Sequence, residues 1–375
     1  MEKISSLALT FDDVLLKPGH TGFLRSDIST TTKLTKKINI DIPLVSSPMD
    51  TVTEAKLAIA LAQLGGFGFI HRNLSIADQA KQVAKVKKQN LLVGAAIGSS
   101  PGFEQRVETL LTAGVDVLLV DSAHGNSKQV ISTVAYIKKN YKIEVVAGNV
   151  ATAEGARALI NAGADGLRVG MGPGAICTTR MISGMGVPQL TAILDTAKVA
   201  LTRGIPVIAD GGINYSGDIT KALAAGASSV MMGRLFAATC ESSGDIILLK
   251  TSQVPRRFRN IINGAKTYEF KQYRGMGSVG AMQKGIKVSS EDEFHGKSYT
   301  SDVLIAEGVE GLVPVSGKVD ELATMLIGGL KSGMYYTGKK SIKELQDAKF
   351  TRITQASLHE SHPHDLFVTN AGGNY

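Results

Sequence analysis

The sequence predicts an α/β protein built as a single (β/α)8 TIM barrel, and three observations support this fold class. Short aliphatic and β-branched runs alternate with stretches of helical period, which is typical of parallel βαβ units. Eight such runs occur, the number of strands that closes a barrel of this type. Polar or glycine-rich residues follow six of them, at the strand ends where barrel enzymes build their sites.

The expected strands follow one another up to residue 232. They cover Ile42–Ser46, Phe67–His71, Leu91–Ile97, Val115–Val120, Glu144–Ala147, Gly166–Val169, Pro206–Ala209 and Ser229–Met232. Segments of helical period lie between them, such as Glu54–Leu64, Ile76–Lys88 and Gln189–Thr202, and each would return the chain to start another parallel strand. With right-handed crossovers this order closes into a barrel.

The pattern changes after the eighth strand. Residues 248–311 mix glycine, serine and charged residues with little periodicity, over a length too great for an ordinary connection. We expect an insertion there that includes a mobile flap. Helical period returns at Val319–Gly333 and Ser341–Ala348, and the tail Ala356–Tyr375 is polar. We therefore expect one catalytic barrel domain over residues 1–375, with a flap-bearing insertion and a C-terminal extension.

Composition excludes several classes of protein. The 375 residues contain no apolar stretch long enough to cross a bilayer, and residues 1–10 lack a secretion signal, so we expect a cytoplasmic protein. The two cysteines, Cys177 and Cys240, form neither a disulfide framework nor a zinc cluster. We expect Cys240 to be a small apolar side chain within a helix over Leu235–Ser242.

The net charge of +8 raises the question of an anionic partner. Most lysines, such as Lys81 and Lys85, are scattered along helical faces, and only Pro255–Arg259 forms a dense cluster. This distribution favours an anionic small substrate and makes nucleic acid an unlikely partner.

The loop Gly170–Arg180 follows the sixth expected strand. Its glycines Gly172 and Gly174 allow backbone groups to approach a phosphate or an ion closely. Cys177 lies within this loop, where a thiol can meet a substrate instead of filling a core. We therefore predict that Cys177 is a nucleophile.

A second glycine-rich pair follows the seventh and eighth strands, at Asp210–Gly212 and Met232–Arg234. Many barrels bind phosphate on the backbone amides of these two loops. The Asp210 carboxylate suits ribose hydroxyls as an acceptor, so phosphate and sugar together indicate a nucleotide. The alternative is that Gly211 and Gly212 only form a turn.

Six segments resemble the inosine-5′-monophosphate (IMP) dehydrogenase and GMP reductase family. They are Leu9–Leu16, Ser46–Val52, Gly170–Arg180, Val207–Gly212, Tyr273–Ser278 and Glu360–Asp365, and they span nearly the whole chain. The last two favour IMP dehydrogenase over GMP reductase. The resemblance implies an NAD-dependent oxidoreductase of purine biosynthesis, which oxidises IMP to XMP for GMP synthesis. Most of these dehydrogenases carry two CBS modules after the second helix, whereas Lys87–Asn90 here runs directly into the third strand, so no CBS domain is expected.

The resemblance also implies roles for individual residues. Cys177 would attack the purine C2, hydride would pass to NAD, and hydrolysis of the adduct would release XMP. Thr179 and Glu307 would complete the catalytic set. The implied substrate-binding residues are Ser47, Met49, Asp210, Gly211, Gly212, Gly233, Arg234, Tyr273, Gly275, Met276 and Gly277. The implied cofactor-binding residues are Asp121, Ser122, Asn149, Arg168, Gly170 and Gly172.

A bound potassium ion is implied as well. Its metal-binding set would be Gly172, Gly174 and Cys177, through their carbonyls, joined by Glu360, Ser361 and His362 of a second subunit. Because two subunits contribute to this site, the resemblance implies a homotetramer.

Three departures from the family leave alternatives open. Ala175 and Arg234 replace two phosphate-binding serines, and we hypothesise that the Arg234 guanidinium compensates. The family's flap uses an Arg-Tyr pair to activate water, but Ser289–Phe294 is acidic here, and a basic segment Lys250–Arg259 is additional. A GMP reductase, whose adduct loses ammonia and accepts hydride from NADPH, and a catalytically weak purine-nucleotide-binding barrel remain the alternatives.

Overall fold

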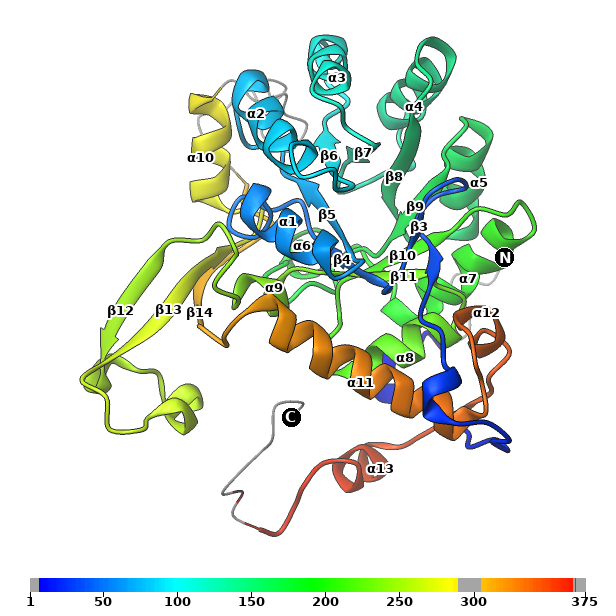
Figure 1. Cartoon of the computed structure of the whole chain (residues 1–375), viewed down its shortest axis with the longest axis vertical. Helices are drawn as coiled ribbons and strands as arrows, with labels where there is room; N and C mark the ends of the chain where they lie inside the picture. The colour runs from blue at the N-terminus through cyan, green and yellow to red at the C-terminus, as the bar shows by residue number, and fades with distance from the viewer. Residues whose placement is uncertain (1–6, 289–304, 367, 369–375) are drawn as a thin grey trace.

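The computed structural model describes residues 7–288, 305–366 and 368. Eight parallel strands form a closed barrel in the order β10-β11-β4-β5-β6-β7-β8-β9 (Figure 1). The strands are β4 (Leu44–Ser46), β5 (Phe67–Ile70), β6 (Gly94–Ile97), β7 (Val117–Asp121), β8 (Glu144–Val150), β9 (Gly166–Val169), β10 (Val207–Asp210) and β11 (Ser229–Met232). The predicted (β/α)8 barrel is confirmed, and all eight expected strands are present with small shifts at their ends.

Seven longer helices surround the barrel: α1 (Ala55–Gln63), α2 (Ile76–Lys87), α3 (Phe103–Thr112), α4 (Lys128–Asn140), α5 (Ala153–Asn161), α7 (Gln189–Leu201) and α8 (Ser216–Ala224). Hydroxyl side chains cap several of them. Ser75, Ser127 and Thr152 accept the backbone N–H three residues ahead at the starts of α2, α4 and α5, which satisfies a donor that the helix leaves open. The two short helices α6 (Thr179–Ser183) and α9 (Arg234–Ala237) follow β9 and β11.

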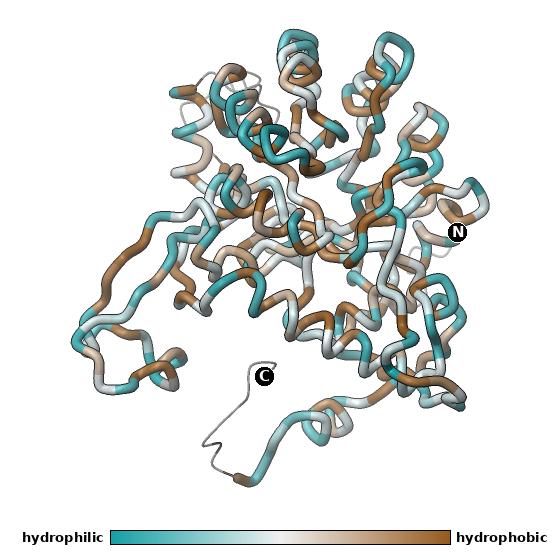
Figure 2. Tube along the Cα trace, viewed as in Figure 1, coloured by the Kyte–Doolittle hydropathy of each residue, from teal (hydrophilic) through white to brown (hydrophobic). Residues whose placement is uncertain are grey.

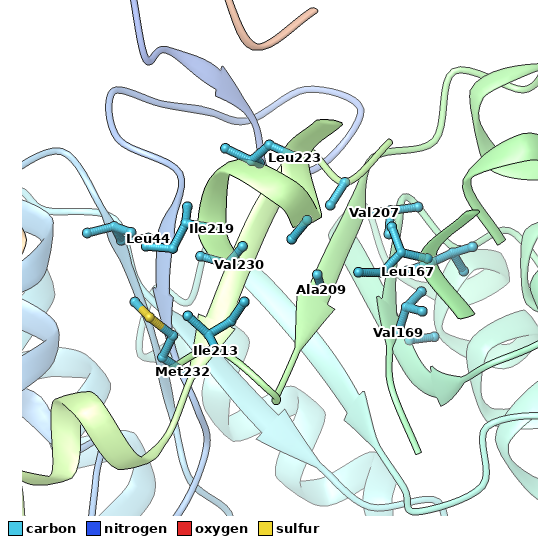
Figure 3. Close-up of a cluster of buried hydrophobic side chains, with 14 of the residues drawn as sticks. Leu44, Leu167, Val169, Val207, Ala209, Ile213, Ile219, Leu223, Val230 and Met232 are labelled. Atoms are coloured by element: carbon cyan, nitrogen blue, oxygen red, sulfur yellow. The ribbon is translucent and has the colours of Figure 1, made fainter. Parts of the chain in front are cut away.

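The hydrophobic core lies in two layers, inside the barrel and between its strands and the helices. Val45, Phe67, Leu119 and Ile208 belong to the inner cluster and are inaccessible to solvent. In the outer layer, side chains from β4, β9, β10 and β11 pack with Ile219 and Leu223 of α8 (Figure 3). Hydrophilic and hydrophobic residues alternate along the outer helices (Figure 2).

The stretch after β11 differs from the irregular connection that we expected. A three-stranded antiparallel sheet of β12 (Ile246–Lys250), β13 (Thr267–Arg274) and β14 (Glu310–Pro314) projects from the barrel (Figure 1). Two 3-10 helices, η3 (Thr251–Gln253) and η4 (Arg256–Ile261), join its first two strands, and α10 (Val279–Lys287) follows β13. β12 reads Ile-Ile-Leu-Leu, without alternation of polar and apolar residues, so its sequence does not indicate a strand with one buried face. The acidic segment Ser289–Phe294 lies outside the described residues.

The ends of the chain meet at one side of the barrel. β1 (Val14–Leu16) pairs with β15 (Phe350–Arg352) in antiparallel orientation. Smaller elements near the start are η1 (Phe11–Asp13), η2 (Arg25–Asp27), β2 (Thr32–Lys33) and β3 (Asn39–Ile40), and the last part contains α11 (Val319–Thr337), α12 (Ile342–Leu345) and α13 (Gln355–Glu360). The predicted terminal helices are confirmed, and α11 continues beyond its expected end.

The helix expected over Leu235–Ser242 was wrong beyond Ala237. α9 ends there, and the half-buried Cys240 lies in the turn that follows. The backbone N–H of Cys240 donates to Gly317 O at 2.9 Å. Among the described residues, no helix is long and apolar enough to span a membrane.

Candidate active site

A pocket opens at the C-terminal ends of the barrel strands and brings together most of the predicted site residues. Its lining includes Ser47, Met49, Asp121, Ser122, Asn149, Arg168, Gly170, Gly172, Gly174, Cys177, Thr179, Asp210, Gly211, Gly233, Tyr273, Gly275, Met276, Gly277 and Glu307. Residues separated by up to 260 positions thus share one cavity, because parallel strands converge on this face. Gly212, Arg234 and the three residues 360–362 are not part of this lining.

The Cys177 side chain is exposed at the pocket and begins a short chain of hydrogen bonds. Its Sγ donates to Thr179 Oγ1 at 3.2 Å, and Thr179 Oγ1 donates to Glu307 Oε2 at 2.9 Å. A hydroxyl that accepts from one group and donates to another can pass a proton between them. The three residues therefore form a path from the thiol to a carboxylate.

The sheet insertion supplies the carboxylate of this path. Cys177 forms an antiparallel bridge with Gly308, in which Thr178 N donates to Glu307 O at 2.9 Å and Val309 N donates to Ile176 O at 3.0 Å. This pairing fixes Glu307 beside the cysteine loop, although 128 residues separate it from Thr179.

The same short segment is held on its other side by the Tyr273–Ser278 motif. Glu307 N donates to Gly277 O at 3.1 Å, and Gly275 N donates to Val309 O at 3.0 Å. Residues 307–309 therefore lie between the cysteine loop and the Tyr273–Ser278 motif.

Asp210 lies at the end of β10, where the following loop approaches the cysteine loop, and one of its oxygens is saturated. Its Oδ2 accepts hydrogen bonds from Arg168 Nε and Asn149 Nδ2, each at 2.9 Å. Within the described residues, Oδ1 accepts no hydrogen bond and remains available to a ligand hydroxyl. The predicted residue is thus in place, and two buried side chains fix its orientation.

Arg168 connects the end of β10 to the end of β7. Its Nη1 donates to Asp121, so the guanidinium lies between two carboxylates. Burial opposes the charge, yet Asp210 and Asp121 together raise the pKa of Arg168 above its ordinary value. Arg168 and Asn149, which we predicted on the cofactor side, therefore direct their polar groups to other residues of the site.

Gln189 was missed by the sequence analysis. Its Nε2 donates to Val169 O and Asp210 O, both at 3.0 Å, so this buried amide joins the ends of β9 and β10. Glutamine at the start of a helix is unremarkable in sequence, and no pattern points to this role.

The loops after β10 and β11 approach the pocket with their backbones. Gly211 and Gly212 both have positive φ, at 86° and 78°, which favours glycine. A Cβ atom on Gly233 would lie 2.6 Å from Tyr273 Oη and 3.0 Å from Met49 Sδ, so a larger residue there would displace these two side chains of the pocket wall. Burial and the nearby Asp210 raise the pKa of Tyr273 well above 10, which keeps its hydroxyl neutral.

Arg234 points toward the neighbouring loop. Its Nη2 donates to Asn214 Oδ1 at 3.2 Å, an exposed contact just outside the pocket. Ala175, also exposed, offers no hydroxyl. The structure therefore places Arg234 beside the phosphate-type loops, and its contact with a ligand stays a prediction.

A buried ion pair lies behind the wall formed by Met49, Tyr273 and Met276. Arg274 Nε donates to Asp50 Oδ1 at 3.1 Å, and Asn73 Nδ2 donates to Asp50 Oδ2 at 2.9 Å. Burial acts in the opposite direction, but the hydrogen bond from Arg274 and the nearby positive charges hold the pKa of Asp50 below its ordinary value. The residues that face the pocket thus alternate along the chain with residues that anchor it.

The predicted metal ligands lie in two separate places within this chain. Gly174 O accepts the Cys177 N–H at 3.0 Å, whereas the carbonyls of Gly172 and Cys177 accept no hydrogen bond from the described residues. The end of α13 lies elsewhere, where the His362 ring packs 6.0 Å from the Tyr215 ring. Among the described residues, no group of three or more His, Cys, Asp or Glu side chains could hold a metal.

Comparison with known proteins agrees with this geometry. A family model described as "IMP dehydrogenase / GMP reductase domain" matches residues 8–364. The inosine-5'-monophosphate dehydrogenase of Rhodopirellula baltica is 40% identical, over 100% of this chain and 89% of that protein. The enzymes of the same name from Borreliella burgdorferi and Cryptosporidium parvum are 43% and 42% identical, over 97% and 98% of this chain and 98% and 97% of those proteins. The chain belongs to the IMP dehydrogenase / GMP reductase family.

Proposed function

We propose that this protein is an IMP dehydrogenase that oxidises IMP to XMP through a covalent adduct on Cys177. The observation that carries the proposal is the path from Cys177 through Thr179 to Glu307, which opens into the same pocket as Asp210. The relatives described above are named for this activity and match nearly all of the chain, which supports the dehydrogenase over a reductase.

The nucleotide would bind along the pocket from its ribose and phosphate to its base. Asp210 Oδ1 would accept the ribose hydroxyls, because Arg168 and Asn149 already engage Oδ2. The backbone at Gly211, Gly212 and Gly233 would receive the phosphate, since no side chain separates it from the ligand. This orientation directs the purine toward Cys177.

The first half of the reaction forms a bond between sulfur and the purine. The Cys177 thiolate adds to C2 of IMP, and the thiol proton moves through Thr179 toward Glu307. The C2 hydrogen leaves with its bonding electrons as hydride, so the bound purine is oxidised by two electrons.

The second half releases the product by hydrolysis. Glu307 first releases the thiol proton to solvent. A water molecule then adds to C2 while Thr179 accepts a proton from it and passes its own to Glu307. The bond between C2 and sulfur then breaks, XMP leaves, and Cys177 regains a proton. This path gives the reaction a base within the described residues. The segment Ser289–Phe294, where we expected no counterpart of the family's Arg-Tyr pair, lies outside them.

NAD, when bound, would accept the hydride. The pocket continues past Cys177 to Asp121, Ser122 and Ala123 at the end of β7, which leaves a lined surface beside the purine. Ser122 Oγ and the backbone of Gly172 are polar groups of this lining, whereas the N–H and the carbonyl of Gly170 bond to Val150 and Asn149. These residues fit a second ligand next to the nucleotide.

Potassium, the homotetramer and the cytoplasmic location remain proposals that follow from the family resemblance. The carbonyls of Gly172 and Cys177 fit a monovalent cation, because they are not used by other described groups. The remaining ligands would be Glu360, Ser361 and His362 of another subunit, which do not reach this loop in their own chain. The proposed potassium site and the proposed homotetramer therefore depend on each other.

A spectrophotometric assay tests the function. With IMP and NAD, we expect absorbance from NADH to rise, and mass spectrometry should detect a purine adduct on Cys177 under single turnover. Oxidation of NADPH with GMP would instead identify a GMP reductase. Binding of IMP without turnover in either assay would contradict both enzymatic readings and favour the catalytically weak barrel.

A further inference from the structure

The barrel strands β9 and β10 carry the two groups that the proposed reaction must align. β9 ends at Val169 and leads into the cysteine loop, and β10 ends at Asp210, whose carboxylate would hold the ribose. The two strands pair in parallel as far as Val169 and Ala209. The position of Cys177 relative to the ribose therefore depends on how the chain is held just beyond this pairing.

Beyond the pairing, each strand turns to its other neighbour. Gly170 N donates to Val150 O of β8 at 2.9 Å, and Gly211 N donates to Met231 O of β11 at 3.3 Å. The two chain segments are therefore drawn to opposite sides directly after β9 and β10 end.

The amide of Gln189 joins the two strand ends at this point. Its Nε2 donates to Val169 O and to Asp210 O, both at 3.0 Å, and the side chain is only 1% exposed. One nitrogen thus bonds to the last carbonyl of each strand, where the pairing between the strands has ended. This geometry identifies the nitrogen of the amide, because the amide oxygen would face two carbonyl oxygens.

The start of the cysteine loop packs directly against this junction. Gly170 has a φ of 147°, and a Cβ atom there would collide with Asp210 O and lie 3.0 Å from both polar atoms of the Gln189 amide. Farther along, a Cβ atom on Gly211 would lie 3.0 Å from Pro173 Cγ. The loops after β9 and β10 therefore pack closely against each other, and the amide lies at the base of both.

Gln189 is itself held to the far end of the cysteine loop. It is the first residue of α7, and Val187 just before it forms an antiparallel bridge with Met171. The Arg180 side chain secures this bridge, since its Nε donates to Met171 O at 3.0 Å and its Nη2 donates to Val187 O at 2.7 Å. The amide therefore lies next to a closed base of the loop that contains Cys177.

A second buried glutamine provides a comparison. Gln79 of α2 donates through Nε2 to Ile70 O and Ala96 O, and its Oε1 accepts from Arg106 at 2.8 Å. The Oε1 atom of Gln189 is buried and has no hydrogen-bond partner among the described residues. Because a buried acceptor without a partner opposes stability, Gln189 is the less well satisfied amide of the two. Its distinguishing feature is the pair of strands that it joins.

We propose that Gln189 is a positioning residue, which sets the spacing between the Cys177 thiol and a ribose bound at Asp210. This role rests on the proposed function, in which Cys177 adds to a purine whose ribose Asp210 holds. Sulfur and C2 must approach to about 3–3.5 Å before they react, and an error of about 1 Å can slow a reaction by about 100-fold. Without the amide, Asp210 still binds the ribose and Cys177 remains a nucleophile, but the two are no longer aligned.

The variant Gln189→Met tests this role, because methionine has a similar size and cannot donate a hydrogen bond. With IMP and NAD, we expect kcat to fall by about 10-fold or more. The dissociation constant of IMP, measured by isothermal titration, should stay within about twofold of the parent, since the Asp210 carboxylate keeps its own bonds. The rate at which iodoacetamide alkylates Cys177, followed by mass spectrometry, should also stay within about twofold, because a small reagent needs no alignment.

Gln79→Met is the matched control, since it removes a buried amide that also joins two strands. We expect it to lower the midpoint of urea unfolding at least as much as Gln189→Met, and to leave kcat within about twofold of the parent. A loss of kcat in Gln189→Met no greater than in the control would overturn the proposal. A matching loss of IMP affinity or of alkylation rate would do the same. If the control fails to fold, Gln346→Met replaces it, because this half-buried amide also donates to two carbonyls.

The same assays separate this role from the proposed function. A parent that is inactive with IMP and NAD but oxidises NADPH with GMP would contradict the dehydrogenase. The comparison of kcat values would then be made with GMP, whose reduction also requires a Cys177 adduct, and would support or overturn the role of Gln189 by the same criterion. A parent without turnover in either assay would overturn both proposals. If Gln189→Met fails to fold, Gln189→Asn tests the same contact, since its shorter amide cannot reach both carbonyls.

Discussion

The two walls of the pocket are built in opposite ways. Around Asp210 the polar groups are buried and bonded, with Arg168, Asp121 and Asn149 each less than one tenth exposed. Around Cys177 the loop is exposed, and a single hydrogen bond holds the thiol. Residues held by several hydrogen bonds can orient a ligand without moving. An exposed thiol with one hydrogen bond can transfer a proton and form a covalent bond. We infer that binding and chemistry are assigned to different residues of one cavity.

The largest effect should follow from removal of the thiol. Cys177→Ala leaves no nucleophile, so we expect no detectable NADH formation from IMP. Isothermal titration should still detect IMP, because the Asp210 wall is untouched. Residual turnover above the level of the buffer would show that the loop around Cys177 is not where the covalent bond forms.

Glu307→Gln should be the next most severe change. An amide cannot accept the proton that Thr179 delivers, so we expect kcat to fall by about 100-fold or more. The Cys177 adduct should then accumulate, which mass spectrometry would detect.

Glu310→Gln is the control for this change, because Glu310 is exposed and bonds only to the backbone of Gly280 among the described residues. We expect the control to keep nearly full kcat. An unchanged kcat in Glu307→Gln would contradict the proton path.

Arg168→Gln tests the wall around Asp210. It leaves Asp121 and Asp210 buried without their shared cation, at a cost of about 3 kcal/mol or more in the free energy of unfolding. We also expect the KM for IMP to rise more than kcat falls, because Asp210 loses its orientation. Urea unfolding and steady-state kinetics measure the two effects.

The exposed Arg157 on α5 provides the comparison, since Arg157→Gln should change neither quantity. If Arg168→Gln lowered kcat and left KM unchanged, the division between the two walls would be wrong.

Asp50→Asn probes the anchor behind the pocket and its dependence on pH. Bonds to the ionised carboxylate hold the pKa of Asp50 below the ordinary value of 3.8, so its contribution to stability is complete above that value. It is lost as the pH falls through the lowered pKa. The stability difference between parent and variant should therefore be large at pH 7 and should shrink at pH 3. A constant difference in urea unfolding at both pH values would exclude ionised Asp50 as its source.

Arg234→Ala should have the smallest effect. If its guanidinium replaces the missing serine hydroxyls, IMP binding should weaken by about 1 kcal/mol, or roughly fivefold. Because Arg234 bonds only to Asn214 among the described residues, stability should not change. An unchanged affinity for IMP would indicate that backbone groups alone bind the phosphate.

Sequence patterns predicted the barrel well because each strand has a local sequence signal. The eight apolar runs, each followed by a turn, needed no knowledge of distant contacts. The pocket residues were predicted from the same strand ends and from the family resemblance. What could not be predicted are contacts through space, such as the amide of Gln189 across two strand ends or the bridge between Cys177 and Gly308. Arg168 was assigned to the cofactor side, because nothing in its sequence context indicates two carboxylate partners.

The bridge between Cys177 and Gly308 has a consequence for how this enzyme acquires its activity. All eight barrel strands are complete at residue 232, and Cys177 and Asp210 are then present. The proton acceptor comes 75 positions after that point, from a segment outside the barrel. On the proposed mechanism, the barrel can therefore gather its nucleophile and its ribose-binding carboxylate during synthesis well before it has a base. Catalytic competence would arrive only when the growing chain places Glu307 against the cysteine loop.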